Sequence, residues 1–168
     1  MTKITDKFLN PQSAIANILG SICNEPKLLI DNNVKLEKED FVLDFHKIVF
    51  TAINNIIADV GTENQISSFD VDTFLKNFES YYQVWKDSKG LDYLQACIDN
   101  VNPATFNLNY ETVKKMSLLR LYKSKGFSLE GIYDYTTSDP TKFAEQQKQL
   151  AKMSLDEIVS YFDNSLLS

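Results

Sequence analysis

Few side chains in this sequence have types and spacing that could support catalysis. The one histidine, His46, lies on the most regularly apolar stretch, which favours a hydrogen-bonded structural residue over a base or ligand. Carboxylates pair at Asp40 with Asp44 and at Asp70 with Asp72. Neither pair has the second histidine or further acidic motif that hydrolytic or two-metal chemistry would require. Helix caps and solvated helix faces therefore explain these carboxylates best.

A nucleotide site of the P-loop type is equally poorly supported. Gly126 and Gly131 have the glycine spacing of GxxxxGK[ST], but Ile132 and Tyr133 occupy the positions of its Lys and Ser/Thr. Those two residues must reach phosphate and magnesium, so the match is interpreted as chance.

The two cysteines, Cys23 and Cys97, lie inside apolar runs and have no CxxC partner. This pattern predicts buried thiols in a reducing compartment rather than a disulfide or a metal site. We therefore expect no catalytic residues, no cofactor-binding residues and no metal site in this chain.

Two clusters could instead bind other molecules. Tyr81, Tyr82 and Trp85 could stack on nucleic-acid bases, although such clusters more often anchor a segment to a core. The second cluster is a basic patch in a stretch without acidic residues. It consists of Lys114, Lys115, Arg120, Lys123 and Lys125. It could guide an acidic partner or DNA, and an ordinary solvated helix face is an equal alternative.

The composition limits the class of protein further. A chain of 168 residues, 43% of them hydrophobic, suits one domain or one domain with an appendage. Its 11 Phe and 8 Tyr are too much apolar surface for a disordered chain. No apolar run approaches the ~18 residues of a membrane span, and the N-terminus lacks a signal-peptide pattern, so we expect a cytoplasmic protein without membrane contact.

The positions of apolar residues predict helices throughout. Apolar residues recur every three or four positions from Phe45 to Val60 and stop at Gly61, which indicates a core helix. Asp70 is the expected N-cap of its helix. The stretch from Met116 to Tyr122 is apolar on nearly every face, which predicts a helix between two packing surfaces. The remaining predicted helices begin near Pro11, Leu91, Asn107, Asp139 and Ser154. In the first of them, the apolar residues from Ile15 to Ile22 follow helical spacing. Asp139 is an expected N-cap followed by Pro140, and Ser154 to Glu157 matches a capping box.

We therefore predict an all-α fold, a compact helical bundle followed by a C-terminal helical hairpin. The expected segments are a flexible lead-in over 1–10, a globular lobe over 11–105, a helical hairpin over 106–153 and a last helix over 154–168. The charge divides near the same boundary: residues 1–106 carry 9 basic and 15 acidic side chains, whereas 107–168 carry 8 of each.

Several short motifs follow one another in a fixed order along the chain. They are Pro11-Gln12-Ser13, Ile18 to Ile22, Glu39-Asp40-Phe41, His46 to Ile53, Leu91 to Leu94, Asn100 to Ala104, Asn107 to Tyr110 and Leu118-Leu119-Arg120. Together they resemble the N-terminal domain of DnaB-type replicative DNA helicases. The 16 Lys beside one Arg, and the 14 Asn, are typical of AT-rich genomes and their phages, so we expect a divergent, phage-encoded member.

The resemblance implies an assembly and docking role. Hairpins of neighbouring subunits would pair into dimers and a hexameric collar, on which DnaG-type primase and helicase loaders dock, with DNA contacted indirectly through the ring. ATP and Mg²⁺ would be bound only in a full-length helicase, and the segment from Ser154 would begin the linker to its motor. The expected interface residues are Met116, Leu119, Tyr122, Phe127, Ile132 and Phe143, with packing inside their own hairpin as the alternative.

Two other functions remain open at this stage. A free-standing adaptor that binds a helicase, such as a loader, a primase tail or an inhibitor, would have the same fold. A P-loop motif beyond Ser168 would favour the helicase, and a stop codon would favour the adaptor. A single-stranded nucleic-acid binder that uses the basic patch and the Trp85 cluster is disfavoured by the net charge of −6.

Overall fold

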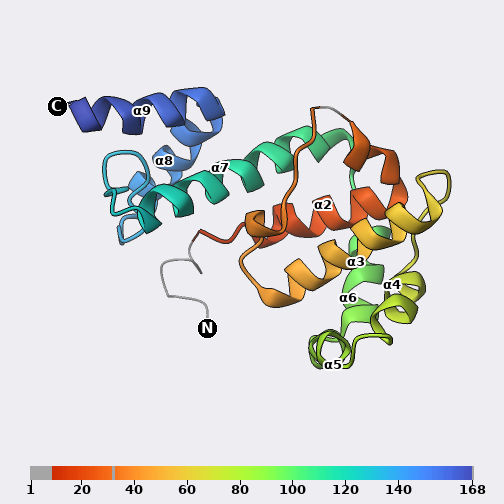
Figure 1. The fold of residues 1–168 in the computed structure, drawn as a ribbon. Coiled ribbons are helices and arrows are strands. Elements are labelled where there is room, and N and C mark those ends of the chain that lie inside the picture. Colours follow the sequence, from red (N-terminus) through yellow and green to blue (C-terminus); the bar gives the residue numbers. More distant parts are fainter. Residues whose placement is uncertain (1–8, 32, 168) are drawn as a thin grey trace.

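The computed structural model describes residues 9–31 and 33–167, and every regular element in these ranges is a helix (Figure 1). The predicted all-α class, a helical bundle followed by C-terminal helices that fold back, is confirmed. The predicted lead-in over 1–10 and the end of the last segment at Ser168 lie mostly outside the described residues. The boundaries of the four predicted segments stay a prediction.

Within residues 9–31 and 33–105, the chain forms a lobe of five α-helices and three short 3₁₀ turns (Figure 1). α2 packs against both α6 and α7, while α3, α4 and α5 pack beside one another. The elements are α2 (Gln12–Asn24), η1 (Pro26–Ile30), η2 (Lys38–Asp40), α3 (Asp44–Val60), α4 (Ser68–Leu75), α5 (Glu79–Asp87), α6 (Gly90–Asp99) and η3 (Pro103–Thr105).

The central helix α2 buries the apolar stripe that its sequence predicts. Ile15, Ile18, Leu19 and Ile22 are fully buried in the lobe's core. Gly20 faces α6 at a point where an added Cβ would overlap the backbone carbonyl of Cys97. A residue without a side chain is therefore what allows α2 and α6 to approach so closely.

Two ends of lobe helices show how local chemistry sets their bounds. α3 ends at Gly61, whose φ of 82° is in the left-handed region that favours glycine. The N-cap of α4 is Ser67 and not Asp70, which corrects the sequence prediction. The Ser67 hydroxyl accepts from the Asp70 N–H at 3.1 Å, and the Asp70 carboxylate accepts from the Ser67 N–H at 2.8 Å. Asp70 thus occupies the third helical position of a capping box.

The aromatic cluster lies on α5 and is divided between core and surface. Trp85 is 1% exposed, and its indole N–H donates to the buried Asp72 carboxylate at 2.9 Å. Tyr82 is half-buried and Tyr81 is 52% exposed. Trp85 therefore anchors α5 to α4 and the core, as the sequence favoured, and cannot stack on bases from this position.

The C-terminal part consists of α7 (Phe106–Ser124), α8 (Pro140–Lys152) and α9 (Leu155–Leu167). α7 extends from the lobe to the region of α8 and α9, at the far end of the molecule (Figure 1). Its first half contributes Phe106 and Val113 to the lobe's core, and its second half contributes Met116 and Leu119 to a separate core. α7 as a whole thus links two cores. The segment from Met116 to Tyr122, for which two packing surfaces were predicted, contributes buried residues to the second core alone and leaves Leu121 47% exposed, so that prediction is corrected.

The caps predicted for α8 and α9 are also present. The Asp139 carboxylate accepts from the N–H groups of Thr141 and Lys142 and so caps α8. Pro140 follows Asp139 directly and is the first residue of the helix. The Ser154 hydroxyl accepts from the Glu157 N–H at 3.1 Å, so α9 begins with the expected capping box. Two residues therefore separate α8 from α9, and α9 begins with a start signal of its own.

Candidate functional site in the C-terminal helices

The second core joins α7, α8, α9 and the segment between α7 and α8. It contains Leu9, Met116, Leu119, Leu129, Tyr133, Leu150, Ile158 and Phe162. Aromatic rings pack in and against this core: the ring of Tyr122 stacks on that of Phe162 at 4.1 Å between centroids, and Phe127 meets Phe162 edge-on at 5.5 Å. This core gives the C-terminal helices a hydrophobic centre of their own.

The structure places the predicted interface residues mainly inside this core. Leu119 is fully buried and Met116 is 7% exposed. Tyr122, Phe127 and Ile132 are half-buried and pack against the second core. Met116 and Leu119 therefore pack within the chain, which was the alternative that the sequence left open. A contact of Tyr122, Phe127 and Ile132 with a partner stays a prediction.

Among the side chains that the structure describes on the C-terminal helices, three large apolar ones are exposed and available for contact with a partner. Phe143 is 36% exposed at the start of α8, and was among the predicted residues. Leu108 and Leu121 on α7 are 62% and 47% exposed and were missed. Helical phase could have found Leu121, because a residue two positions after the buried Leu119 points about 200° away from it.

The predicted basic patch is not one solvent-facing strip. Lys114 reaches back to the lobe, where its ammonium donates to both oxygens of the Asp40 carboxylate at 3.1 and 3.0 Å and to the Lys35 carbonyl at 2.9 Å. Arg120 also reaches the lobe and donates to the carbonyl oxygens of Leu9 at 2.7 Å and Asp40 at 2.9 Å. These two side chains therefore hold α7 against Leu9, which precedes α2, and against the segment that precedes α3.

Lys115 points in another direction and is only 5% exposed. Its ammonium donates to the carbonyl oxygens of Leu150 and Ala151, both at 3.2 Å, and lies 3.7 Å from the Glu111 carboxylate. A cation at the C-terminal end of a helix meets unpaired carbonyls and the negative end of the helix dipole. Lys115 thus caps α8 from α7.

The last two basic residues lie nearer the surface. The Lys123 ammonium is 5.5 Å from the centroid of the Tyr135 ring, and Lys125 is exposed. The predicted contact patch is therefore corrected to intramolecular fastening by Lys114, Lys115 and Arg120, which leaves Lys123 and Lys125 toward solvent.

The side chains considered for catalysis, His46 and the two cysteines, are buried in the lobe. The His46 Nε2 and the Tyr93 hydroxyl are 3.0 Å apart beside the lobe's core, and burial lowers the pKa of His46 to about 4. Burial raises the pKa of the Cys23 thiol to about 12. Cys23 and Cys97 are both buried and unbridged. Such groups are poor bases and nucleophiles near neutral pH.

The described part of the chain contains neither a candidate metal cluster nor a candidate membrane span. No cluster of three or more His, Cys, Asp or Glu side chains in residues 9–31 and 33–167 is arranged to hold a metal ion. None of the helices described in these ranges combines the length and the apolar character that crossing a bilayer requires.

Comparison with known proteins links the lobe to one family. The model of the DnaB-like helicase N terminal domain matches residues 9–114, which cover the lobe and the first half of α7. The SPbeta prophage-derived uncharacterized protein YorI of Bacillus subtilis (strain 168) is 33% identical over 161 residues. The aligned region covers 95% of this chain and 32% of that protein, so the chain spans about a third of its relative's length. No solved structure matches the chain.

Proposed function

The chain belongs to the DnaB-like helicase N-terminal domain family, and on this premise we propose that it is the assembly and docking domain of a replicative DNA helicase. The observation that carries the proposal is the family match over residues 9–114. This domain is non-catalytic by itself, which agrees with the burial of His46, Cys23 and Cys97. A prophage-derived relative of similar sequence supports a phage-encoded member of this family.

The proposed domain works through protein contacts. Copies of the chain pair through the C-terminal helices and build dimers and a hexameric collar, cytoplasmic in location. DnaG-type primase or a helicase loader docks on that collar, and DNA is contacted indirectly through the ring. ATP and Mg²⁺ belong to the motor of the parent helicase.

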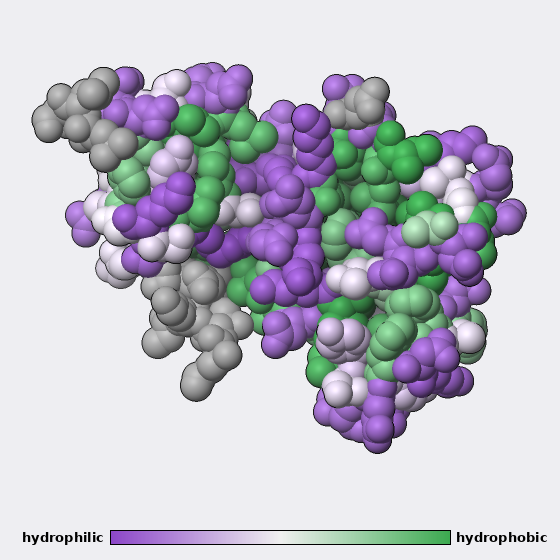
Figure 2. Space-filling view, viewed as in Figure 1, coloured by the Kyte–Doolittle hydropathy of each residue, from purple (hydrophilic) through white to green (hydrophobic). Residues whose placement is uncertain are grey.

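The burial pattern changes which residues should carry self-association. Met116 and Leu119 already have apolar neighbours within the chain, so a second copy would gain little by contacting them. Leu121 and Phe143 expose apolar surface on α7 and α8, and covering such surface is favourable. Figure 2 shows hydrophobic residues on the α8–α9 end and on the lobe, with hydrophilic residues between them. We therefore propose Leu121 and Phe143 as self-association residues.

Sedimentation equilibrium tests this proposal. Wild type should have the mass of a dimer or hexamer, and Leu121→Asp and Phe143→Asp should sediment near the 19.2 kDa of one chain. Val60→Asp is the matched control, because Val60 is a 63% exposed apolar residue on α3 in the lobe and its variant should assemble normally. Circular dichroism checks that each variant is folded. A wild type that remains a folded monomer at high concentration would overturn the assembly role and favour a free-standing adaptor.

A further inference from the structure

Leu9 precedes α2 in the sequence, yet its side chain belongs to the core of the C-terminal helices, where it is fully buried. Its carbonyl oxygen accepts from the Arg120 guanidinium on α7 at 2.7 Å, across 111 positions of the sequence. We call the second core and this guanidinium together the Leu9 seat. Ala14, in the first turn of α2, is buried in the lobe's core instead. The chain therefore passes from one core to the other at the start of α2.

Asn10 and Pro11 connect Leu9 to α2, and we call these two residues the hinge. Pro11 has a φ of −81° and a ψ of 76°, and the Gln12 N–H donates to the Asn10 carbonyl at 2.9 Å. These angles and this hydrogen bond define an inverse γ-turn. The hinge thus turns the segment before α2 back toward the C-terminal helices of its own chain.

One torsion angle sets the direction of that segment. The pyrrolidine ring fixes φ of Pro11, so its ψ decides how the preceding residues leave the helix. A ψ of about 145° would convert the turn into an extended, polyproline-like conformation. The Ile15 N–H donates to the Pro11 carbonyl at 3.0 Å, and this bond is kept because the carbonyl moves with α2. The hinge can therefore open without unwinding the helix.

The turned hinge contains an unsatisfied polar atom. The Asn10 Oδ1 is buried, and among the described residues no donor lies within hydrogen-bond distance of it. A buried acceptor without a partner lowers the stability of the conformation that holds it. In an extended hinge Asn10 reaches water, which supplies donors to its side chain. Opening the hinge therefore removes a cost, and the γ-turn bond that it breaks is replaced by bonds to water.

We propose that the segment before α2 is exchanged between two copies of the chain, so that Leu9 of each copy fills the Leu9 seat of the other. The structure selects this occupant, because the seat already holds Leu9 and a second copy supplies the same side chain and the same carbonyl oxygen. Exchange keeps both contacts and changes only the hinge, and for this reason domain swapping is a low-cost route to dimers. A short connection favours it further. The inference rests on the proposed self-association and adds a contact to those of Leu121 and Phe143.

Cross-linking in a mixture of isotopes tests the exchange. Photo-leucine, a diazirine of nearly the same size, takes the place of Leu9 in chains with and without a heavy nitrogen isotope. Equal amounts of the two are refolded together, the dimer is isolated and illuminated, and cross-links from position 9 to the second core are identified by mass spectrometry. About half of them should join a heavy peptide to a light one, as random pairing of exchanged copies requires.

Photo-leucine at Leu129 is the matched control, because Leu129 is buried in the same core and belongs to the C-terminal part itself. Its cross-links to α9 should join peptides of the same isotope, and circular dichroism checks that both proteins are folded. A dimer in which every cross-link from position 9 joins peptides of the same isotope would overturn the exchange and leave self-association through Leu121 and Phe143 intact. A folded monomer would overturn both.

A second variant tests the hinge. Asn10→Ala removes the unsatisfied acceptor and so stabilises the turned hinge, and the dissociation constant of the dimer should rise about tenfold or more. Sedimentation equilibrium measures it. Asn64→Ala is the control, since Asn64 is exposed between α3 and α4 and its variant should associate as wild type. Equal dissociation constants for the two variants would overturn the role of Asn10 in the exchange.

Discussion

Lys114 on α7 and Asp40 in η2 form an ion pair at 3.0 Å that joins segments 74 positions apart in the sequence. Asp40 is 3% exposed, and its carboxylate also accepts from the Glu37 N–H at 2.8 Å. The pair therefore connects the capping box of η2 to the helix that links the two cores. A carboxylate with so little access to water depends on its protein partners.

Replacing Lys114 with Met should lower the free energy of unfolding by about 2–3 kcal/mol, because it leaves the Asp40 charge buried without its cation. Urea denaturation measures the loss. Lys125→Met provides the control, since this exposed lysine should change stability by less than about 0.5 kcal/mol. Equal effects for the two variants would show that the ion pair does not stabilise the fold.

The neighbouring residue should behave differently, because Lys115 caps α8. Lys115→Met keeps the length of the side chain and removes the cation that pairs with the carbonyls of Leu150 and Ala151. We expect a local loss of about 1–2 kcal/mol. Hydrogen exchange should show it as faster exchange of α8 amides, with the amides of α2 and α3 unchanged. Uniformly faster exchange across the chain would instead indicate a global role.

Lys114 and Lys115 show what could not be predicted from the sequence, namely the neighbour that each side chain contacts. Periodicity predicted the helices well, since apolar spacing and caps are local: Ile15 to Ile22, the stop at Gly61 and the box at Ser154 all appear as predicted. The sequence grouped Lys114 and Lys115 into one patch because they are adjacent. On a helix, adjacent residues point about 100° apart, so one faces the lobe and the other faces α8.

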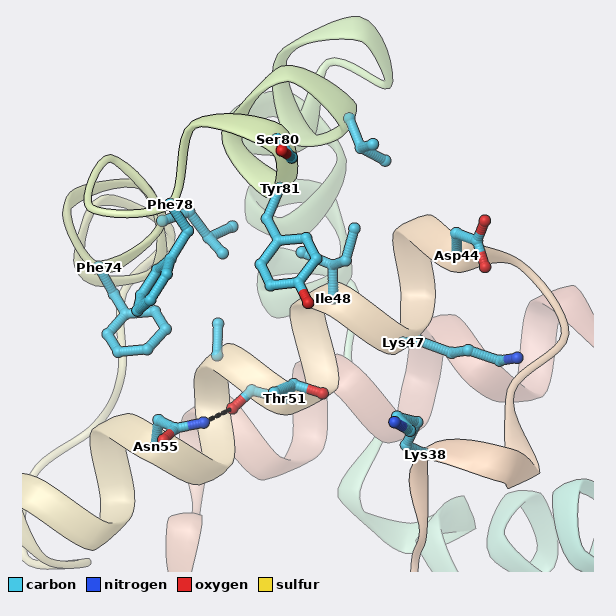
Figure 3. Close-up of a pocket in the computed structure, with 13 residues that line it drawn as sticks. Lys38, Asp44, Lys47, Ile48, Thr51, Asn55, Phe74, Phe78, Ser80 and Tyr81 are labelled. Carbon is cyan, nitrogen blue, oxygen red and sulfur yellow. Dashed lines mark hydrogen bonds between the residues drawn. The ribbon is translucent and has the colours of Figure 1, made fainter.

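The sequence also could not specify which core each apolar residue joins. Leu9 belongs to the predicted polar lead-in, yet it is fully buried in the second core. The groove between α3 and the pair formed by α4 and α5 (Figure 3) was missed for a similar reason. The sequence grouped Tyr81 only with Tyr82 and Trp85, and tertiary packing places it instead beside Phe78 and opposite α3.

The contact between α2 and α6 makes a prediction about Gly20. Gly20→Ala should destabilise the chain by about 2–3 kcal/mol, since its Cβ would meet the Cys97 backbone and force the helices apart. Thermal unfolding followed by circular dichroism measures this. Gly131→Ala is a matched control, because the Cβ there would meet only the end of the Tyr161 side chain, which can move. A Gly20→Ala variant as stable as this control would contradict the close packing of the two helices.

Stability should depend on pH through His46. Its pKa is about 4 in the folded chain and 6.5 when solvated, so between these values the unfolded chain binds a proton that the folded chain does not. The free energy of unfolding should therefore fall as pH decreases from 6.5 to 4. The total loss of unfolding free energy expected from His46 is on the order of 3 kcal/mol. This loss is absent above pH 6.5.

Other groups titrate in the same range, so the comparison needs a variant without the imidazole. His46→Gln keeps a polar nitrogen near the Tyr93 hydroxyl and does not titrate. Urea denaturation of both proteins at a series of pH values isolates the histidine, because the chain contains no other. As the pH falls from 6.5 to 4, the free energy of unfolding should decrease more for wild type than for His46→Gln. Parallel pH profiles would mean that His46 is protonated equally in the folded and unfolded chains, and so is not held neutral by burial.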